Sequence, residues 1–413
     1  MNAQLKTQTQ TLTINGRRLW DSLMEMAKIG ATPKGGVCRL ALTDLDKQGR
    51  DLFVRWAKEA GCAVSVDQMG NVFARRAGLD DTLPPVVTGS HADSQPTGGR
   101  FDGIYGVLGG LEVIRSLNDH GIQTRRPVEV VIWTNEEGSR FAPAMVASGV
   151  FAGVFTLEYG LSRADVDGKT MGEELQRIGY AGDQPMGKPI HAAFELHIEQ
   201  GPILETENVT IGVVTHAQGQ RWYEVVLTGQ ESHAGPTPMP RRRDALLGAA
   251  KVIQLVNQIG LDHAPYACAT VGMLQVHPNS RNVIPGRVFF TVDFRHPDDA
   301  VLAQMDEALR VGVAKIVSDA KLELTKLEQI FYYKPNCVAS VRAGASRFGY
   351  AHRDIVSGAG HDACYLAQVA PTSMVFVPCV GGISHNEIED ATPEWIEAGA
   401  NVLLHAMLER AQN

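Results

Sequence analysis

The chain has 413 residues, of which 44% are hydrophobic and 20% are charged, so it is long enough for two domains or for one domain with a large insertion. Its net charge of -8 argues against a nucleic-acid partner. We see no signal-peptide pattern and no apolar run that could cross a bilayer, and therefore expect no membrane association. The six cysteines are scattered singly, which is typical of reduced thiols in a cytoplasmic protein.

The first half of the chain alternates strand and helix patterns. We expect strands at 84–89, 127–135 and 192–201, and a helix at 102–121. This alternation predicts a mainly parallel sheet with helices on both faces. Ligands of such sheets bind beyond the carboxyl ends of the strands, and His91, Glu136, Glu137 and His197 fall near those ends.

The alternation of strand and helix patterns changes at about Gln218. We expect strands at 221–230, 266–278, 287–297 and 321–332, and helices at 241–260 and 298–320. The order β-α-β-β-α-β is typical of a compact α+β domain. After residue 334 the α/β rhythm returns, with a strand at 372–378 and a last helix capped by Thr392. The prediction is a discontinuous α/β catalytic domain, 1–216 and 332–413, and an inserted α+β domain, 217–331.

The stretch "VVTGSHADSQPTGGRFDGIYG" brings a histidine and two aspartates to the end of a strand. Asp93 is well placed to accept the imidazole N–H of His91 and so fix its tautomer, as partners of metal-binding histidines do. Asp102 follows a loop that Gly98 and Gly99 allow to turn back sharply. The alternatives are a structural histidine and a helix N-cap at Asp102, the second of which is compatible with metal binding.

Two adjacent carboxylates, Glu136 and Glu137, follow a buried strand, where they repel one another unless a cation or proton lies between them. Adjacent side chains point in different directions, so one can bind a metal while the other acts as a general base. The alternative is a solvated acidic loop. His197 and His385 add imidazoles, and no thiolate joins the set, which suits Zn²⁺, Mn²⁺, Co²⁺ or Ni²⁺. A shared aspartate with two histidines and a glutamate suits a pair of metals about 3.5–4 Å apart.

Eight motifs, in order, resemble those of the N-carbamoyl-L-amino-acid hydrolases: "GSHADSQPTGGRFDG", "NEEGSRF", "LHIEQGP", "GQESHAGPTPM", "NSRNVIPG", "DFRH", "GAGHDA" and "GISHNEIED". That family groups with β-ureidopropionases and allantoate amidohydrolases among the two-metal amidohydrolases related to zinc aminopeptidases. The resemblance covers the chain from about Gly16 to its end. It implies a zinc-aminopeptidase-like catalytic domain with an inserted lid and dimerisation domain.

The resemblance also implies roles for individual residues. The ligands of two divalent metal ions would be His91, Glu137, His197, His385 and a bridging Asp102. Glu136 would be the general base, and His233 would stabilise the oxyanion. Arg295 would pair with the substrate carboxylate, helped by Gln200, Asn282 and the backbone N–H of Gly360. From the residues alone, an ion pair of Arg295 with Asp293 and a turn at Asn282 are favoured instead.

The function that follows is hydrolysis of N-carbamoyl L-α-amino acids to the amino acid, ammonia and CO₂, as in hydantoin degradation. The resemblance implies a homodimer, paired through the inserted domains, with His233 crossing to the partner's site. Alternatives are β-ureidopropionase activity on N-carbamoyl-β-alanine, allantoate hydrolysis, a dinuclear aminopeptidase and a non-catalytic binding protein. Arg241 to Arg243 are interpreted as a solvated helix start rather than an anion site.

Overall fold

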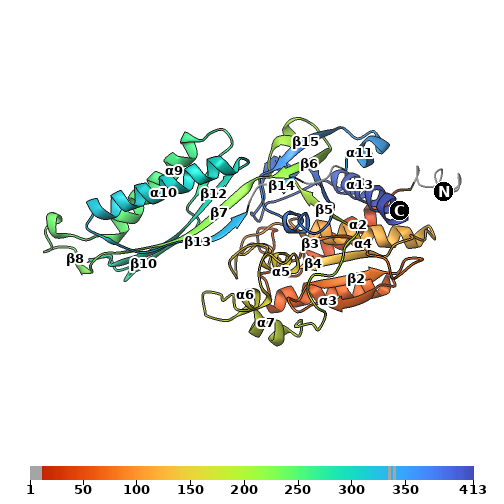
Figure 1. The fold of residues 1–413 in the computed structure, drawn as a ribbon, viewed down its shortest axis with the longest axis horizontal. Coiled ribbons are helices and arrows are strands. Elements are labelled where there is room, and N and C mark those ends of the chain that lie inside the picture. Colours follow the sequence, from red (N-terminus) through yellow and green to blue (C-terminus); the bar gives the residue numbers. More distant parts are fainter. Residues whose placement is uncertain (1–11, 334–335, 338–340) are drawn as a thin grey trace. The chain divides into compact units, whose positions relative to one another are not determined.

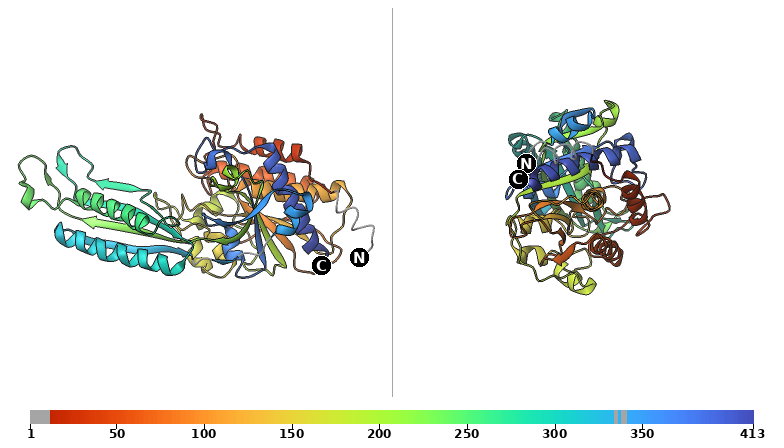
Figure 2. Two further views of the ribbon diagram at one scale, coloured as in Figure 1. Left: turned by 90° about the horizontal axis from the view of Figure 1, so that it is seen from above. Right: turned by 90° about the vertical axis from the view of Figure 1, so that its right-hand side faces the viewer.

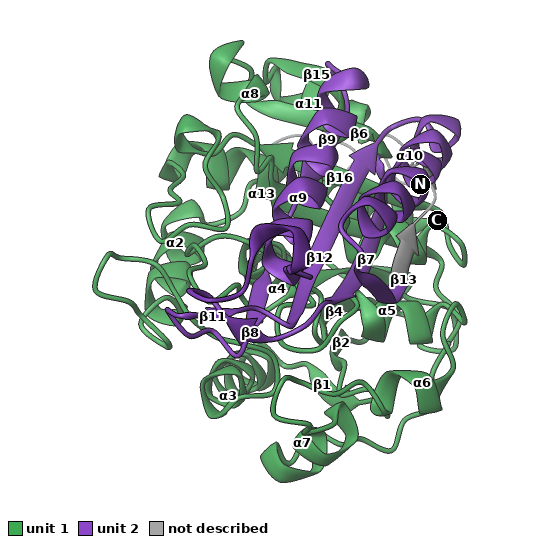
Figure 3. Ribbon diagram, turned by 90° about the vertical axis from the view of Figure 1, so that its left-hand side faces the viewer, with its two compact units in different colours: residues 1–217, 337–413 green, residues 218–336 purple. Residues whose placement is uncertain are grey.

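The computed structural model describes residues 12–333, 336–337 and 341–413. The chain forms two compact units, one made of residues 1–217 and 337–413 and the other of residues 218–336 (Figures 1 and 3). The second unit is therefore inserted into the first. The two are described in turn below as unit 1 and unit 2.

Unit 1 is built on a nine-stranded sheet in the order β1-β2-β4-β3-β5-β16-β6-β14, with β15 beside β6. The four central strands, β4, β3, β5 and β16, are parallel, as the sequence predicts. The antiparallel pairs lie toward the two sides of this parallel centre. The strands are β1 (Ala63–Val66), β2 (Val72–Arg76), β3 (Val86–His91), β4 (Val128–Trp133), β5 (Ala192–Ile198), β6 (Ile211–Ala217), β14 (Asn336–Cys337), β15 (His352–Ser357) and β16 (Thr372–Val377).

Helices cover both faces of this sheet because its strands alternate between two apolar surfaces. Val86 and Val128 belong to the cluster that includes α2, α3, α4 and α13, whereas Val87 and Val131 pack with residues of α5 and α12. Thr392 caps α13 as predicted, its side chain accepting from the amide of Trp395. The helices are α2 (Gly16–Met26), α3 (Asp44–Glu59), α4 (Ile104–Asp119), α5 (Val146–Phe151), α6 (Leu157–Leu161), α7 (Met171–Ile178), α8 (Ile203–Thr206), α11 (Arg342–Phe348), α12 (Asp362–Leu366) and α13 (Pro393–Gln412).

Unit 2 has an antiparallel sheet in the order β10-β12-β7-β13, with β9 also paired to β12. Helices α9 (Ala245–Asp262) and α10 (Asp299–Asp319) pack side by side and bury one apolar cluster with this sheet (Figure 2). The strands are β7 (Gly219–Thr228), β9 (Cys268–Thr270), β10 (Leu274–His277), β12 (Arg287–His296) and β13 (Glu323–Tyr333). A separate two-stranded ribbon, which the sequence did not predict, joins β8 (Ser232–His233) to β11 (Val283–Ile284).

The single strand expected at 266–278 is wrong, because β9 and β10 are separate. Thr270 lies opposite Asp293 and Leu274 lies opposite Phe290. The β9–β10 segment thus advances four residues where β12 advances three, and the extra residue interrupts the ladder. The hydrophobic pattern of the sequence does not reveal one extra residue between two paired segments.

None of the helices in the described ranges combines the length and the apolarity that a membrane crossing requires. The five cysteines whose surroundings are described, which are Cys38, Cys62, Cys268, Cys364 and Cys379, are free thiols.

Candidate active site

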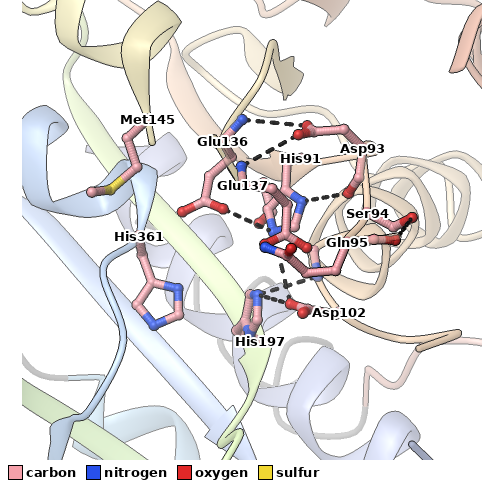
Figure 4. Close-up of polar contacts among 12 residues, drawn as sticks. His91, Asp93, Ser94, Gln95, Asp102, Glu136, Glu137, Met145, His197 and His361 are labelled. Carbon is pink, nitrogen blue, oxygen red and sulfur yellow. Dashed lines mark hydrogen bonds and ion pairs between the residues drawn. The ribbon is translucent and has the colours of Figure 1, made fainter. Parts of the chain in front are cut away.

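Three neighbouring strands deliver polar side chains to one edge of the unit 1 sheet. His91 is the last residue of β3, Glu136 and Glu137 follow β4, and His197 is the penultimate residue of β5. All four are buried, with 1–7% of their surface exposed. Figure 4 shows these side chains gathered in one place, with Asp102 next to His197. The strand-end positions predicted from the sequence therefore come together in space.

Asp102 lies at the centre, and its two oxygens face different partners. Its Oδ1 is 3.2 Å from Nε2 of His197 and 3.8 Å from Nε2 of His91. Its Oδ2 is 3.2 Å from Nε2 of His385, which is itself 3.3 Å from Oε2 of Glu137. In each of the two resulting groups, every pair of potential ligand atoms lies within 4.8 Å. Asp102 belongs to both groups, which is the geometry of a bridging carboxylate.

Two contacts hold the loop that carries Asp102. The backbone at Gly103 packs against the ring of His91, and the buried carboxylate of Glu389 accepts hydrogen bonds from the loop. Gly103 has a φ of +67°, and a Cβ there would lie 2.3 Å from the ring of His91, so only glycine fits. Gly103 is also the N-cap residue of α4, which excludes the N-cap alternative for Asp102. Oε1 of Glu389 accepts hydrogen bonds from the amides of Phe101 and Asp102 at 2.9 and 3.0 Å. Glu389 was missed in the sequence, although it lies in the motif "GISHNEIED".

Two ring orientations are fixed by main-chain carbonyls. Nδ1 of His91 is 2.9 Å from the carbonyl oxygen of Asp93, and Nδ1 of His197 is 2.9 Å from that of Ile198. A carbonyl can only accept, so both Nδ1 atoms carry a proton. The two Nε2 atoms that face Asp102 are then the ones available as metal ligands.

Asp93 acts differently from the prediction in one respect. Its main-chain oxygen, rather than its carboxylate, accepts from the imidazole of His91. The carboxylate instead accepts from the amides of Glu136 and Glu137, each at 3.3 Å. The side chain points toward the loop after β4, so Asp93 orients the histidine and the pair of glutamates at once.

Burial and crowding disturb the ionisation of this cluster. Burial raises the pKa of Glu137 to about 8 and that of Asp93 to about 7. Burial, followed by the charges of Asp362 and Glu137, also raises the pKa of Glu136 well above its usual value. Burial alone would lower the pKa of His197, but its contacts with Asp102 outweigh that and raise it to about 9. Several buried carboxylates thus compete for neutralising charge.

The donor set fits divalent cations. It offers imidazole nitrogens and carboxylate oxygens without thiolates. Oε1 of Glu137 is buried and has no hydrogen-bond partner among the described residues, so one oxygen is left for another ligand. The excess of buried negative charge gives a cation a further favourable interaction.

Glu136 lies beside His91 without belonging to either donor group. Its Oε2 is 3.5 Å from Nε2 of His91, whereas its neighbour Glu137 contacts His385 and receives a 2.7 Å hydrogen bond from Gln95. The two adjacent glutamates thus diverge, as expected from their positions. Glu136 is free to exchange a proton with a molecule held at the cluster.

Two further residues named from the sequence lie close to this centre or to its histidines. Nε2 of Gln200 is 3.1 Å from each oxygen of Asp102. Gly360 lies in the loop between β15 and α12, next to His361, whose ring centroid is 4.7 Å from that of His197. Both are therefore placed in unit 1, and their contacts with substrate stay predictions.

A third donor group, Glu195 with His197 and His361, was missed. Glu195 accepts from the hydroxyl of Ser90 at 2.7 Å and from the amide of Ala363 at 2.9 Å. The sequence contained a signal for Glu195: it precedes His197 by two residues on a buried strand, so the two side chains lie on the same face of the sheet. His361 lies in "GAGHDA", a motif in which the resemblance assigned a role to Gly360 but none to His361.

The remaining predicted residues belong to unit 2 and lie at opposite ends of its sheet. His233 is in β8, and the carbonyl of Asn282 accepts from the amide of Ala234 at 2.8 Å. Both lie near the first residue of β12, Arg287, because β11 directly precedes β12. Arg295 is eight residues further along β12, roughly 26 Å away at about 3.3 Å per residue.

Arg295 makes the ion pair that the sequence alone favoured. Its Nε and Nη2 lie 3.0 and 2.8 Å from Oδ2 of Asp293. Its side chain is about a quarter exposed. A bound carboxylate would therefore compete with Asp293 for the guanidinium group.

The fold places candidate metal-binding groups at the ends of the central strands, and comparison with known proteins supplies the family. Residues 81–409 match the model of peptidase family M20/M25/M40, and the chain belongs to that family. A curated N-carbamoyl-L-amino-acid amidohydrolase of Rhizobium meliloti is 53% identical over 404 residues, covering 97% of each chain. The Arabidopsis thaliana ureidoglycolate hydrolase is 32% identical, covering 95% of this chain and 86% of its own.

A solved structure is still more similar. The hydantoinase/carbamoylase family amidase of Burkholderia vietnamiensis is 80% identical, superimposes with a TM-score of 0.97, and covers 98% of this chain and 99% of its own. Within family M20/M25/M40 the chain therefore belongs to the hydantoinase/carbamoylase amidases. The resemblance given by the eight motifs is confirmed.

Proposed function

We propose that this protein hydrolyses N-carbamoyl L-α-amino acids to the free amino acid, ammonia and CO₂. The observation that carries the proposal is the carboxylate of Asp102, shared by two donor groups, with Glu136 beside His91 of the first group. The Rhizobium meliloti relative, at 53% identity, bears the name of this activity. The ureidoglycolate hydrolases are more distant, so ureidoglycolate is the second candidate substrate.

The proposed cofactors are two divalent ions, one held by His91, Asp102 and His197 and the other by Asp102, Glu137 and His385. Such ions act as Lewis acids on a carbonyl oxygen and increase the acidity of water. The ligands do not choose between Zn²⁺, Mn²⁺, Co²⁺ and Ni²⁺, because imidazole and carboxylate bind all four. Measuring activity after loading each metal separately identifies which metal the enzyme uses.

The residues of the chain would then handle protons and orientation. Glu136 takes a proton from the attacking water and passes it to the leaving nitrogen; its raised pKa suits a group that must do both. His233 donates to the oxygen that becomes negative at the carbamoyl carbon. Arg295 binds the α-carboxylate through two parallel hydrogen bonds after exchanging its partner Asp293, and Gln200, Asn282 and Gly360 add further contacts.

We also propose a homodimer in which unit 2 serves as the lid and dimerisation domain. Within one copy of unit 2, His233 and Arg295 are separated by roughly 26 Å along β12, far more than the length of an amino-acid substrate. One substrate cannot contact both residues of the same copy. A two-fold pairing through unit 2 would let His233 and Asn282 of the second copy complete a site that uses Arg295 of the first.

The substrate proposal is tested by a panel of N-carbamoyl L-, D- and β-amino acids with allantoate, ureidoglycolate and a dipeptide, each assayed for its own hydrolysis product. We expect the highest kcat/KM with an N-carbamoyl L-α-amino acid. Its margin over the β-amino acid should be about 10–200-fold, since one methylene changes the binding free energy by about 1–3 kcal/mol. A higher kcat/KM with ureidoglycolate or allantoate would overturn the assignment.

The dimer proposal is tested by mixing two inactive variants. His233→Ala and Glu136→Gln homodimers should both be nearly inactive, while a heterodimer carries one site with an intact base and an intact histidine. Random reassembly gives half heterodimers, each with one working site of two, so recovery should reach at most about a quarter of wild type. Purified heterodimers without activity would show that His233 acts within its own chain or does not act in catalysis.

A further inference from the structure

Three consecutive arginines, Arg241 to Arg243, come shortly after the loop that follows His233, and their side chains have different surroundings. Arg241 is exposed, with no side-chain hydrogen bond within the described residues. Nε of Arg243 donates to the carbonyl of Lys321 at 2.7 Å. Arg242 is partly buried and contacts the loop that follows His233. A solvated helix start therefore describes Arg241 but not Arg242.

The guanidinium of Arg242 holds two carbonyls of that loop. Its Nε donates to the carbonyl of Thr237 at 3.1 Å and its Nη2 donates to that of Ala234 at 2.6 Å. The rigid planar fork fixes the distance between two points three residues apart. The same loop is tied to the residue just before β11 by the 2.8 Å hydrogen bond from the amide of Ala234 to the carbonyl of Asn282.

The loop in turn sets the tautomer of His233. The amide of Gly235 lies 3.0 Å from Nδ1 of the His233 ring. A backbone amide can only donate, so Nδ1 accepts and the proton of the neutral ring is on Nε2. A Cβ at residue 235 would lie 3.3 Å from the ring, and glycine leaves this approach unobstructed. The ring is thus held in the form that presents an N–H donor at Nε2.

We propose that Arg242 is a positioning residue, which clamps the loop of Ala234 to Thr237 so that the amide of Gly235 keeps His233 as the Nε2–H tautomer. The catalytic consequence rests on the proposed function, in which His233 donates to the developing oxyanion. A hydrogen-bond donor that stabilises developing negative charge must be in place before the reaction, because it lowers the barrier only if it does not have to reorient during the reaction. Arg242 contributes to the reaction through His233 and makes no proposed contact with substrate.

Kinetics of matched variants test the coupling. Removal of an oxyanion donor lowers kcat by about 10²–10³-fold. Arg242→Gln should lower kcat by a smaller factor, about 10–50-fold, with KM changed by less than about 3-fold, because the histidine is displaced rather than removed. Arg242→Lys should recover part of this loss, since one ammonium can hold one of the two carbonyls. Arg241→Gln, next to it and exposed, should keep wild-type kcat.

The decisive comparison is a double variant. If Arg242 acts through His233, then His233→Ala with Arg242→Gln should be no slower than His233→Ala alone. Losses that multiply, or a wild-type kcat for Arg242→Gln, would overturn the proposal. Thermal unfolding of each variant is measured alongside, and the Lys variant provides the test if the Gln variant does not fold.

The tautomer is measured without any activity assay. In histidine-¹⁵N-labelled protein, the ring resonances of His233 are identified by their absence in His233→Asn. We expect the Nε2–H tautomer in wild type and Arg241→Gln, and a mixture of tautomers in Arg242→Gln. An Nδ1–H ring in the wild type would refute the clamp. A confirmed clamp with fully active His233→Ala would instead refute the role of His233 in the proposed function, so the two failures are distinguishable.

Discussion

Replacing Glu389 with alanine should weaken metal binding although Glu389 is not a proposed ligand. Its buried carboxylate accepts three hydrogen bonds, from the amides of Phe101 and Asp102 and, at 2.7 Å, from the hydroxyl of Ser384. Burial and then the charge of Asp102 raise its pKa to about 7, so the carboxylate is kept in this position against an electrostatic cost. Its effect should therefore appear in the placement of Asp102.

The expected loss of metal affinity can be estimated from the hydrogen bond between the amide of Asp102 and Glu389. A hydrogen bond to a charged acceptor contributes about 1.5–3 kcal/mol, of which each 1.4 kcal/mol is a tenfold change in an equilibrium constant. Partners of metal ligands typically change metal affinity by about 10–100-fold. We expect Glu389→Ala to lower the affinity by that factor. Glu389→Gln should lower it by less, because its amide oxygen can still accept from both backbone amides.

Metal affinity is measured by titrating each metal-free variant with Zn²⁺ or Mn²⁺ in a calorimeter, and occupancy by elemental analysis after dialysis. Glu394→Ala is the matched control, since Glu394 is an exposed glutamate in the first turn of α13. It should bind metal like the wild type. Wild-type affinity in a folded Glu389→Ala variant would show that the Asp102 loop holds its position without Glu389, and the reasoning would be wrong.

Three further predictions concern the centre directly. Glu136→Gln should keep its metal content while kcat falls by about 10²–10⁴-fold, the range for loss of a general base, and near-normal turnover would place the base elsewhere. Chelation should abolish activity and leave the far-ultraviolet circular dichroism spectrum unchanged, because a core of this size does not depend on metal; activity in a verified metal-free preparation would contradict the two-metal site. Arg295→Lys should raise KM for carboxylate substrates and hardly affect their amides, since the planar fork is lost while the charge remains, and equal rates on acid and amide with the wild type would exclude carboxylate binding by Arg295.

The sequence alone indicated where the centre would form, because parallel strands have their carboxyl ends at one edge of a sheet. His91, the pair Glu136 and Glu137, and His197 could be placed there from three buried runs and their order. His385 was named as a further imidazole from its place in the sequence. The motif resemblance added its expected role as a metal ligand and the expected bridging role of Asp102, which strand patterns do not contain. It also identified the amidase family.

Other features were decided by tertiary structure, because they depend on contacts between segments far apart in the chain. The hydrogen bond from the amide of Asp102 to Glu389 joins residues 287 positions apart, and no local pattern records it. The break between β9 and β10 depends on their register against β12, and register is set by both strands together. The separation of His233 from Arg295 has the same origin. β8, which carries His233, pairs with β11 just before the start of β12, whereas Arg295 lies near the end of β12.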